Sequence, residues 1–272
     1  MDKRIDWRAL RSRAVQRLAL ELASVACACS GEGHARPVTA MGLRFPSPVG
    51  IAAGFDRYGR LARRVAALGF GFNEIGSLTA NEVAQLGVMH NGAARLGISL
   101  TLDARQASAE SRAMLRAAWP HADYLMLNLI GPTSAPLLSQ STRLRHLLAA
   151  LVDEQRQLNQ DGRRRVPLLA KLRCIPERTR FSIAGLLAAH DPGPPATAER
   201  YRAWQDPRRQ AQACQQIEEL RRFCGPDMAL LSVGGVQTAD HLRARMSAGA
   251  ELVQVHTAFM HQSPWLARRL LR

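Results

Sequence analysis

The 272-residue sequence predicts an α/β fold, a parallel (β/α)8 barrel of the TIM type with a helical segment ahead of it. From residue 49 onward, short apolar runs alternate with longer amphipathic stretches, and such alternation requires crossovers between parallel strands. Runs such as YLMLNL and PLLAKL are apolar on both faces, as a sheet covered by helices requires. The chain length also suits one barrel of about 250 residues.

An amphipathic helix is expected over residues 5–28, where apolar residues recur at helical spacing among arginines. Its apolar positions are Leu10, Ala14, Leu18, Leu22 and Val25. A short hairpin is expected at 38–45, before Pro46 and Pro48. The predicted organisation is therefore an N-terminal helical extension, 1–36, followed by a barrel, 37–272.

Seven strands can be assigned by short apolar runs, although a closed barrel of this type needs eight. They are expected at 49–53, 72–77, 97–100, 124–129, 167–172, 229–233 and 252–256. Helices are expected between them at 61–68, 107–119, 142–158, 208–223 and 239–247. The unassigned sixth strand falls between Lys171 and Ala229, where 181–189 fits a helix or a strand. The sequence thus leaves open an irregular or open barrel at this position.

The amino-acid composition limits the kinds of partner that this protein is expected to bind. Net charge is +15, from 37 Lys and Arg against 22 Asp and Glu, and most of the basic excess is arginine. This charge fits either an anionic partner or a solvated arginine-rich surface. Nucleic-acid binding is disfavoured, because no recognised motif is present and aromatic residues are only 5%.

Cysteine content and hydropathy indicate a reducing, cytoplasmic location. The cysteines are odd in number and too scattered for a disulfide framework. They are Cys27, Cys29, Cys174, Cys214 and Cys224. No apolar run is long enough for a transmembrane helix, and charges interrupt the N-terminal apolar residues as far as Glu21, unlike a secretory signal.

Functional side chains of a parallel barrel gather where its strands end, at the carboxyl face. The first strand ends in Ala52, Ala53 and Gly54, and such small residues admit a planar ligand close to the backbone, or simply form a turn. The fourth ends at Asn128, whose amide can hydrogen-bond a heteroaromatic ring or form an Asx turn before Pro132.

The ends of later strands carry groups that can bind an anion. Lys171 closes a buried strand, and a desolvated ammonium is costly unless an anion or an electron-rich ring compensates it. Gly234 and Gly235 follow the next-to-last strand, and Thr257 follows the last. Consecutive backbone N–H groups at a Gly-Gly turn form an anion cradle, typical of a barrel phosphate site.

Motifs in the same order resemble the dihydroorotate dehydrogenase family, specifically its membrane-associated, quinone-using class. They lie at 41–45, 48–50, 52–56, 68–72, 122–124, 166–169, 233–235, 248–250 and 252–254, together with the single positions Glu74, Gly76, Asn128, Pro132 and Lys171. The match runs from about residue 38 to the C-terminus, with a gap near 178–228.

The resemblance implies a small-molecule oxidoreductase that holds FMN at the carboxyl face, with a pyrimidine-like substrate and a quinone acceptor. It also implies that residues 5–28 contact the inner face of a membrane; packing on the barrel is the alternative for this helix. Arg57 and Asn128 would contact the substrate. FMN would be held by Ala52, Ala53, Gly54, Ser77, Asn128, Lys171, Gly234, Gly235 and Thr257.

Several departures bear on catalysis. The family's base is a serine three residues after Asn128, and this chain has Gly131 there. Thr133 and Ser99 replace asparagines, and Arg57 replaces a lysine. The family's sixth-strand Thr-Asn segment and its glycine-rich flavin loop have no counterpart that the sequence places.

Loss of a general base slows a proton transfer by roughly 10²–10⁴. The available substitutes are His90 and His256, although either also fits a structural role. Two functions therefore remain: a flavin oxidoreductase with an altered substrate, or a barrel that has lost catalysis and acts as a binding or scaffold protein.

Overall fold

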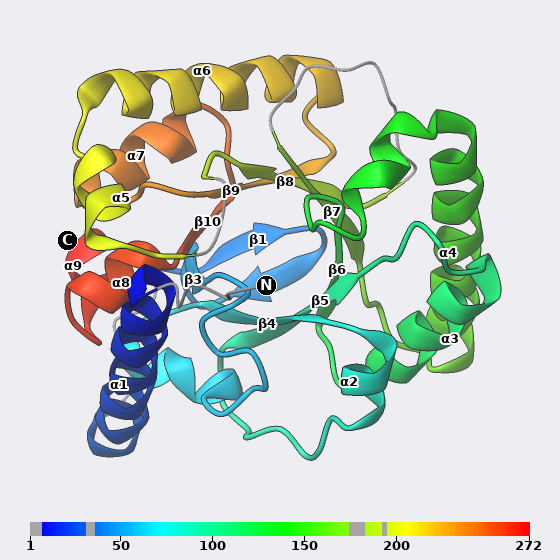
Figure 1. The fold of residues 1–272 in the computed structure, drawn as a ribbon, viewed down its shortest axis with the longest axis horizontal. Coiled ribbons are helices and arrows are strands. Elements are labelled where there is room, and N and C mark those ends of the chain that lie inside the picture. Colours follow the sequence, from blue (N-terminus) through cyan, green and yellow to red (C-terminus); the bar gives the residue numbers. More distant parts are fainter. Residues whose placement is uncertain (1–6, 31–35, 174–182, 192–194) are drawn as a thin grey trace, which may run out of the picture.

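The computed structural model describes residues 7–30, 36–173, 183–191 and 195–272. Eight parallel strands close into one barrel in the order β10-β3-β4-β5-β6-β7-β8-β9, with helices around its outside (Figure 1). The barrel strands are β3 (Val49–Ile51), β4 (Phe72–Leu78), β5 (Arg95–Thr101), β6 (Tyr124–Asn128), β7 (Leu168–Arg173), β8 (Gly185–Ala189), β9 (Ala229–Val233) and β10 (Leu252–Val255).

Helical segments follow most of the strands, as the alternating pattern predicts. They are α1 (Trp7–Cys29), the 3-10 helix η1 (Ala62–Leu68), α2 (Ala80–Ala84), α3 (Ser108–Ala118), the 3-10 helix η2 (Ala135–Ser139), α4 (Ser141–Asp161), α5 (Ala198–Ala203), α6 (Pro207–Cys224), α7 (Ala239–Ser247), α8 (Thr257–His261) and α9 (Leu266–Leu270). All five helices predicted between strands are present, the first of them as η1. The short helices α2, α5, α8 and α9 were not predicted.

Each predicted strand corresponds to a barrel strand, and β8 supplies the missing one. β8 falls within the ambiguous segment 181–189, of which 181 and 182 lie outside the described residues. Leu187 of β8 aligns with Lys171 of β7 on one side and with Leu231 of β9 on the other. The barrel is therefore closed here, which decides against the alternative of an irregular or open barrel. All five residues of β8 are buried, so its sequence lacks the alternation that identifies a half-exposed strand.

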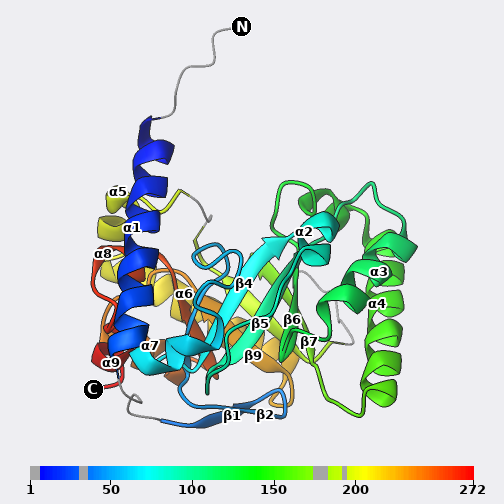
Figure 2. The same ribbon diagram turned by 90° about the horizontal axis from the view of Figure 1, so that it is seen from below.

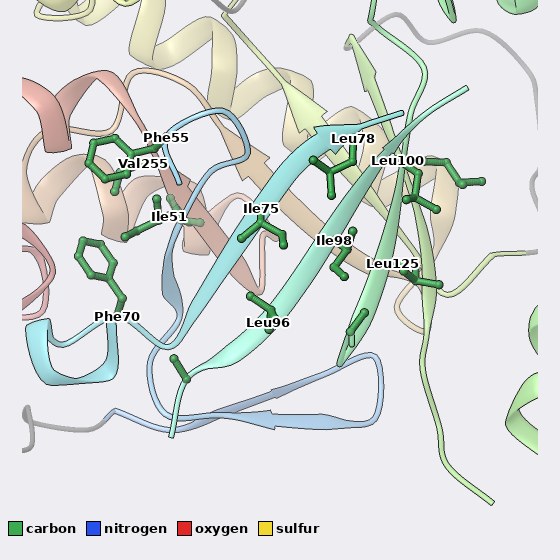
Figure 3. Close-up of a cluster of buried hydrophobic side chains, with 14 of the residues drawn as sticks. Ile51, Phe55, Phe70, Ile75, Leu78, Leu96, Ile98, Leu100, Leu125 and Val255 are labelled. Atoms are coloured by element: carbon green, nitrogen blue, oxygen red, sulfur yellow. The ribbon is translucent and has the colours of Figure 1, made fainter. Parts of the chain in front are cut away.

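Outward-facing strand residues build the main hydrophobic core against the helices. Ile75 of β4 aligns with Ile98 of β5, and both are fully buried in this cluster (Figure 3). A second cluster fills the barrel at the amino ends of the strands, where the ring of Phe72 lies 5.6 Å from Phe45 and 6.3 Å from Tyr124.

The predicted hairpin closes this amino end. It is formed by β1 (Val38–Ala40) and β2 (Leu43–Phe45), which pair antiparallel. Figure 2 shows the hairpin at the end of the barrel opposite α2 and α5. The aromatic plug and the hairpin leave the carboxyl ends of the strands as the open end.

α1 confirms the predicted helix, but its packing differs from the expected pattern. Its small residues Ala23, Ala26 and Cys27 are buried in the main core, whereas Leu18 and Val25 are 61% and 62% exposed. Its N-terminal part extends past the open end of the barrel (Figure 2). None of the helices in the described part of the chain is both long enough and apolar enough to span a membrane.

Candidate functional site

A pocket opens at the carboxyl ends of the strands and encloses about 680 Å³, including the space at its mouth. Residues that follow β3, β8, β9 and β10 line it, together with α5 and Trp204. Predicted cofactor residues in this lining are Ala52, Ala53, Lys171, Gly234, Gly235 and Thr257. The structure thus brings together most of the predicted set, while Gly54, Ser77 and Asn128 lie outside the lining.

Lys171 occupies the floor of the pocket. It points into the barrel from β7, and its ammonium donates no hydrogen bond to any residue that the structure describes. Burial lowers the pKa of Lys171, and the charge of Glu74 acts in the opposite direction. A partly desolvated ammonium without a hydrogen-bond partner is a group that a ligand can satisfy.

Glu74 lies inside the barrel and is fully buried on β4. Its Oε2 accepts a hydrogen bond from Gln254 Nε2 at 2.7 Å and another from the Tyr124 hydroxyl at 3.2 Å. Burial raises its pKa, and the Lys171 charge partly offsets that rise. Glu74 is not among the predicted site residues, although a lone carboxylate within the apolar run FNEIGSL is a signal for it.

Asn128 forms the Asx turn that the sequence left as an alternative. Its Oδ1 accepts from the backbone N–H of Ile130 at 3.1 Å, and its Nδ2 donates to Ser77 Oγ at 2.8 Å. Ser77 in turn bonds Ser99 Oγ at 2.8 Å. These predicted ligand-binding groups are therefore hydrogen-bonded within the protein.

The Gly234–Gly235 turn needs glycine at both positions. Their φ values are +115° and +80°, and a Cβ on Gly235 would overlap the ring of Trp204. The backbone N–H groups of Gly234, Gly235 and Val236 donate to no acceptor among the described residues. Trp204 covers one side of the turn, and the unpaired N–H groups keep the character of an anion cradle.

The region without a family counterpart supplies one wall of the pocket. Tyr201 of α5 and Trp204 both line it, and Trp204 Nε1 donates to Asp191 Oδ2 at 2.8 Å. Asp191, after β8, also lies 3.6 Å from Arg200. No sequence motif marks these residues, because they come together only when β8 and α5 fold against the Gly-Gly turn.

Arg57, predicted to bind substrate, is not among the residues that line the pocket. Its Nη2 donates to both carboxylate oxygens of Glu82, at 2.8 and 3.0 Å. Although burial acts to raise the pKa of Glu82, hydrogen bonds from Thr79 and Arg57 lower it to about 2. Arg57 is therefore held in a surface ion pair in this structure.

Of the two substitute bases, only His256 lines the pocket; His90 is exposed elsewhere. The Nε2 atom of His256 is buried without a partner among the described residues. Burial, with a smaller contribution from the Lys171 charge, lowers the pKa of His256 to about 4. Burial likewise lowers the pKa of His190 to about 4.

These two histidines predict acid-sensitive stability. Between pH 6.5 and 4 the unfolded chain protonates both, while the folded chain keeps them neutral, so stability falls as pH falls. Each proton contributes a slope of about 1.4 kcal/mol per pH unit. We expect His256→Gln to reduce the pH dependence of the free energy of unfolding by the contribution of about one proton. Urea denaturation across this pH range measures it. An unchanged slope would contradict the assignment.

The structure is a (β/α)8 barrel with a pocket at its carboxyl face. A family model described as "Dihydroorotate dehydrogenase" matches residues 208–272. The "Dihydroorotate dehydrogenase (quinone)" of Clavibacter sepedonicus is 30% identical over 296 residues, covering 86% of this chain and 83% of that protein. The protein of the same name from Verminephrobacter eiseniae is 28% identical over 295 residues, covering 87% and 82%.

The chain belongs to the dihydroorotate dehydrogenase family. A crystal structure of DHODH from Eimeria tenella in complex with ferulenol matches with a TM-score of 0.71 and 19% identity, covering 98% of this chain and 90% of that chain. At this identity the structural match supports the fold alone.

Proposed function

We propose that this protein is an FMN-dependent oxidoreductase that acts on a small pyrimidine-like ring at the carboxyl face of the barrel and uses a quinone as electron acceptor. The observation that carries the proposal is Lys171, whose ammonium lines the pocket without a hydrogen-bond acceptor in the described protein. Membership of a family with quinone-dependent relatives supports the reaction class.

The pocket residues fit FMN at both ends. Ala52 and Ala53 allow a planar ring to approach the backbone, and Lys171 offers a charged donor to an electron-rich ring edge. The unpaired N–H groups of Gly234 and Gly235 suit a phosphate. When bound, FMN would supply the hydride acceptor.

The protein's own groups limit how a substrate proton is removed. Gly131 has no side chain to accept a proton, and the amide of Asn128 is bonded to Ser77 and Ile130. The proposed reaction therefore assigns no role to residue 131. It does not include oxidation of dihydroorotate by the serine route that the family uses.

The proposal includes peripheral contact between α1 and the inner face of the cytoplasmic membrane. Leu10, Leu18 and Leu22 are exposed along α1 among several arginines, a pattern that favours an anionic lipid surface. Co-sedimentation with anionic lipid vesicles tests this contact, and an entirely unbound protein would refute it.

Lys171→Met is expected to weaken FMN binding about 10- to 100-fold, because it removes a charge-assisted hydrogen bond. The measurement is a titration of apoprotein with FMN, followed by flavin absorbance and fluorescence. Arg105→Met is the matched control: it also removes one positive charge, and the Arg105 side chain is 84% exposed beside Asp103. Wild-type protein that is colourless and cannot be reconstituted with FMN would refute the proposed function.

Gly131, together with the internally bonded Asn128, favours a second candidate: a barrel that binds a ligand without turnover. Turnover of dihydroorotate with a soluble quinone, above that of a Lys171→Met variant in a steady-state assay, would eliminate the non-catalytic candidate.

A further inference from the structure

Lys171 is exceptional among the basic residues of this chain. Of the 37 Lys and Arg residues, only Lys3 and Lys171 are lysines. Arginine stays charged in essentially every protein environment, whereas a buried lysine can lose its proton. At the floor of the pocket, the charge state of Lys171 therefore depends on its surroundings.

Glu74 is a carboxylate inside the barrel, next to the pocket that Lys171 lines. It lies on β4, is completely buried, and accepts hydrogen bonds at Oε2 from Tyr124 and from Gln254, which itself lines that pocket. Its Oε1 has no hydrogen-bond partner in the described residues. No ion pair within 4.0 Å joins it to Lys171 in this part of the chain, so the two interact through the low-dielectric interior.

The other titratable groups nearby do not replace Glu74. His256, after β10, lines the same pocket and is uncharged at neutral pH. Asp191, after β8, is at the wall, where it pairs with Arg200 and accepts from Trp204. The Tyr124 hydroxyl donates a hydrogen bond to Glu74 itself.

We propose that Glu74 is a positioning residue: it is the buried counter-charge that keeps Lys171 an ammonium, and thereby a hydrogen-bond donor, at the floor of the pocket. Glu74 acts on a bound ring only through Lys171. The part of the proposal that concerns a bound flavin rests on the function proposed above, whereas the pairing of the two charges does not.

The scarcity of lysine makes a direct test practical. Reductive methylation with ¹³C-formaldehyde labels the N-terminal amine, Lys3 and Lys171, and Lys3→Arg and Lys171→Arg variants assign the NMR signals. We expect Glu74→Gln to lower the titration midpoint of the Lys171 signal by about 1 pH unit or more. Tyr124→Phe, which keeps the carboxylate, is the control and should shift it less. An unchanged midpoint in Glu74→Gln would overturn the proposal.

A stability cycle covers the case in which Glu74→Gln folds poorly. Removing one member of a buried charge pair leaves the other uncompensated, so Glu74→Gln should be less stable than Glu74→Gln/Lys171→Met. The midpoints of urea denaturation compare the variants. A double variant no more stable than Glu74→Gln would overturn the pairing.

FMN binding gives a third readout. Both proteins should show the pH dependence of the FMN phosphate, which titrates at about pH 6, but Glu74→Gln should lose affinity relative to wild type as pH rises to about 8 and Lys171 loses its proton. A ratio of the two affinities that does not change with pH would contradict the proposal. If wild-type protein binds no FMN, the function proposed above fails, and the NMR titration still decides the role of Glu74.

Discussion

Gly131→Ser is expected to raise the rate of flavin reduction by dihydroorotate about 100-fold above wild type. The resemblance to the family places its proton-accepting serine at this position, and general bases contribute roughly 10²–10⁴ to such steps. We expect the lower end of this range, because Ser77 and Ile130 engage the amide of Asn128. Stopped-flow absorbance of FMN-loaded protein mixed anaerobically with dihydroorotate measures the rate.

The backbone has room for this change. A Cβ at residue 131 would lie 3.7 Å from both Asn128 Nδ2 and Ser134 Oγ, an ordinary contact distance, and the glycine does not have a positive φ. Gly131→Ala is the matched control, since it adds the same Cβ without a hydroxyl. Equal rates for the serine and alanine variants would show that the lost hydroxyl is not what limits this chain.

Gly235→Ala is expected to destabilise the fold by about 3 kcal/mol or more. A left-handed conformation costs a non-glycine residue about 1–2 kcal/mol, and overpacking adds about 1–3 kcal/mol. Both apply here, because φ is +80° and the added methyl group would overlap the ring of Trp204. Equilibrium urea denaturation measures the loss, and FMN binding should fall with it.

Two other glycines separate these contributions. Gly225 has φ +75° and ψ −178°, a backbone region that essentially only glycine adopts, and nothing lies near its missing Cβ, so Gly225→Ala should show the conformational cost alone, about 1–3 kcal/mol. Gly87 has no positive φ and open space around it, so Gly87→Ala should change stability by less than about 0.5 kcal/mol. A Gly235→Ala effect no larger than that of Gly225→Ala would mean that Trp204 moves aside.

The sequence was sufficient for most of the barrel, because buried parallel strands leave short apolar runs separated by longer amphipathic helices. It failed to decide β8, whose five buried residues fit the interior of a helix as well as that of a strand. Closure depends on pairing β8 with β7 and β9, which is a contact between distant segments. Local pattern carries no information about such pairing.

Some residues of the candidate site could likewise be predicted from the sequence, and others could not. Lys171, Gly234 and Gly235 could be predicted, because each ends a strand and has a residue type with a clear physical use. Asn128 follows from its strand position and Ser77 from the family resemblance, but sequence could not reveal that they bond each other. Trp204 could not be predicted, since only the folded chain brings its ring against the Gly-Gly turn.

The burial of Ala23, Ala26 and Cys27 concerns any attempt to shorten this protein. These α1 residues share one hydrophobic cluster with Val65 and Leu68 of η1, and the Gln16 amide donates to the carbonyl of Phe55 at 3.1 Å. A fragment starting at residue 37 would expose that side of the barrel to water. The loop after β3 would also lose its hydrogen bond from Gln16. Removal of residues 1–36 therefore takes away part of the hydrophobic core together with the exposed leucines. Loss of lipid binding in such a fragment would not isolate the role of the helix surface.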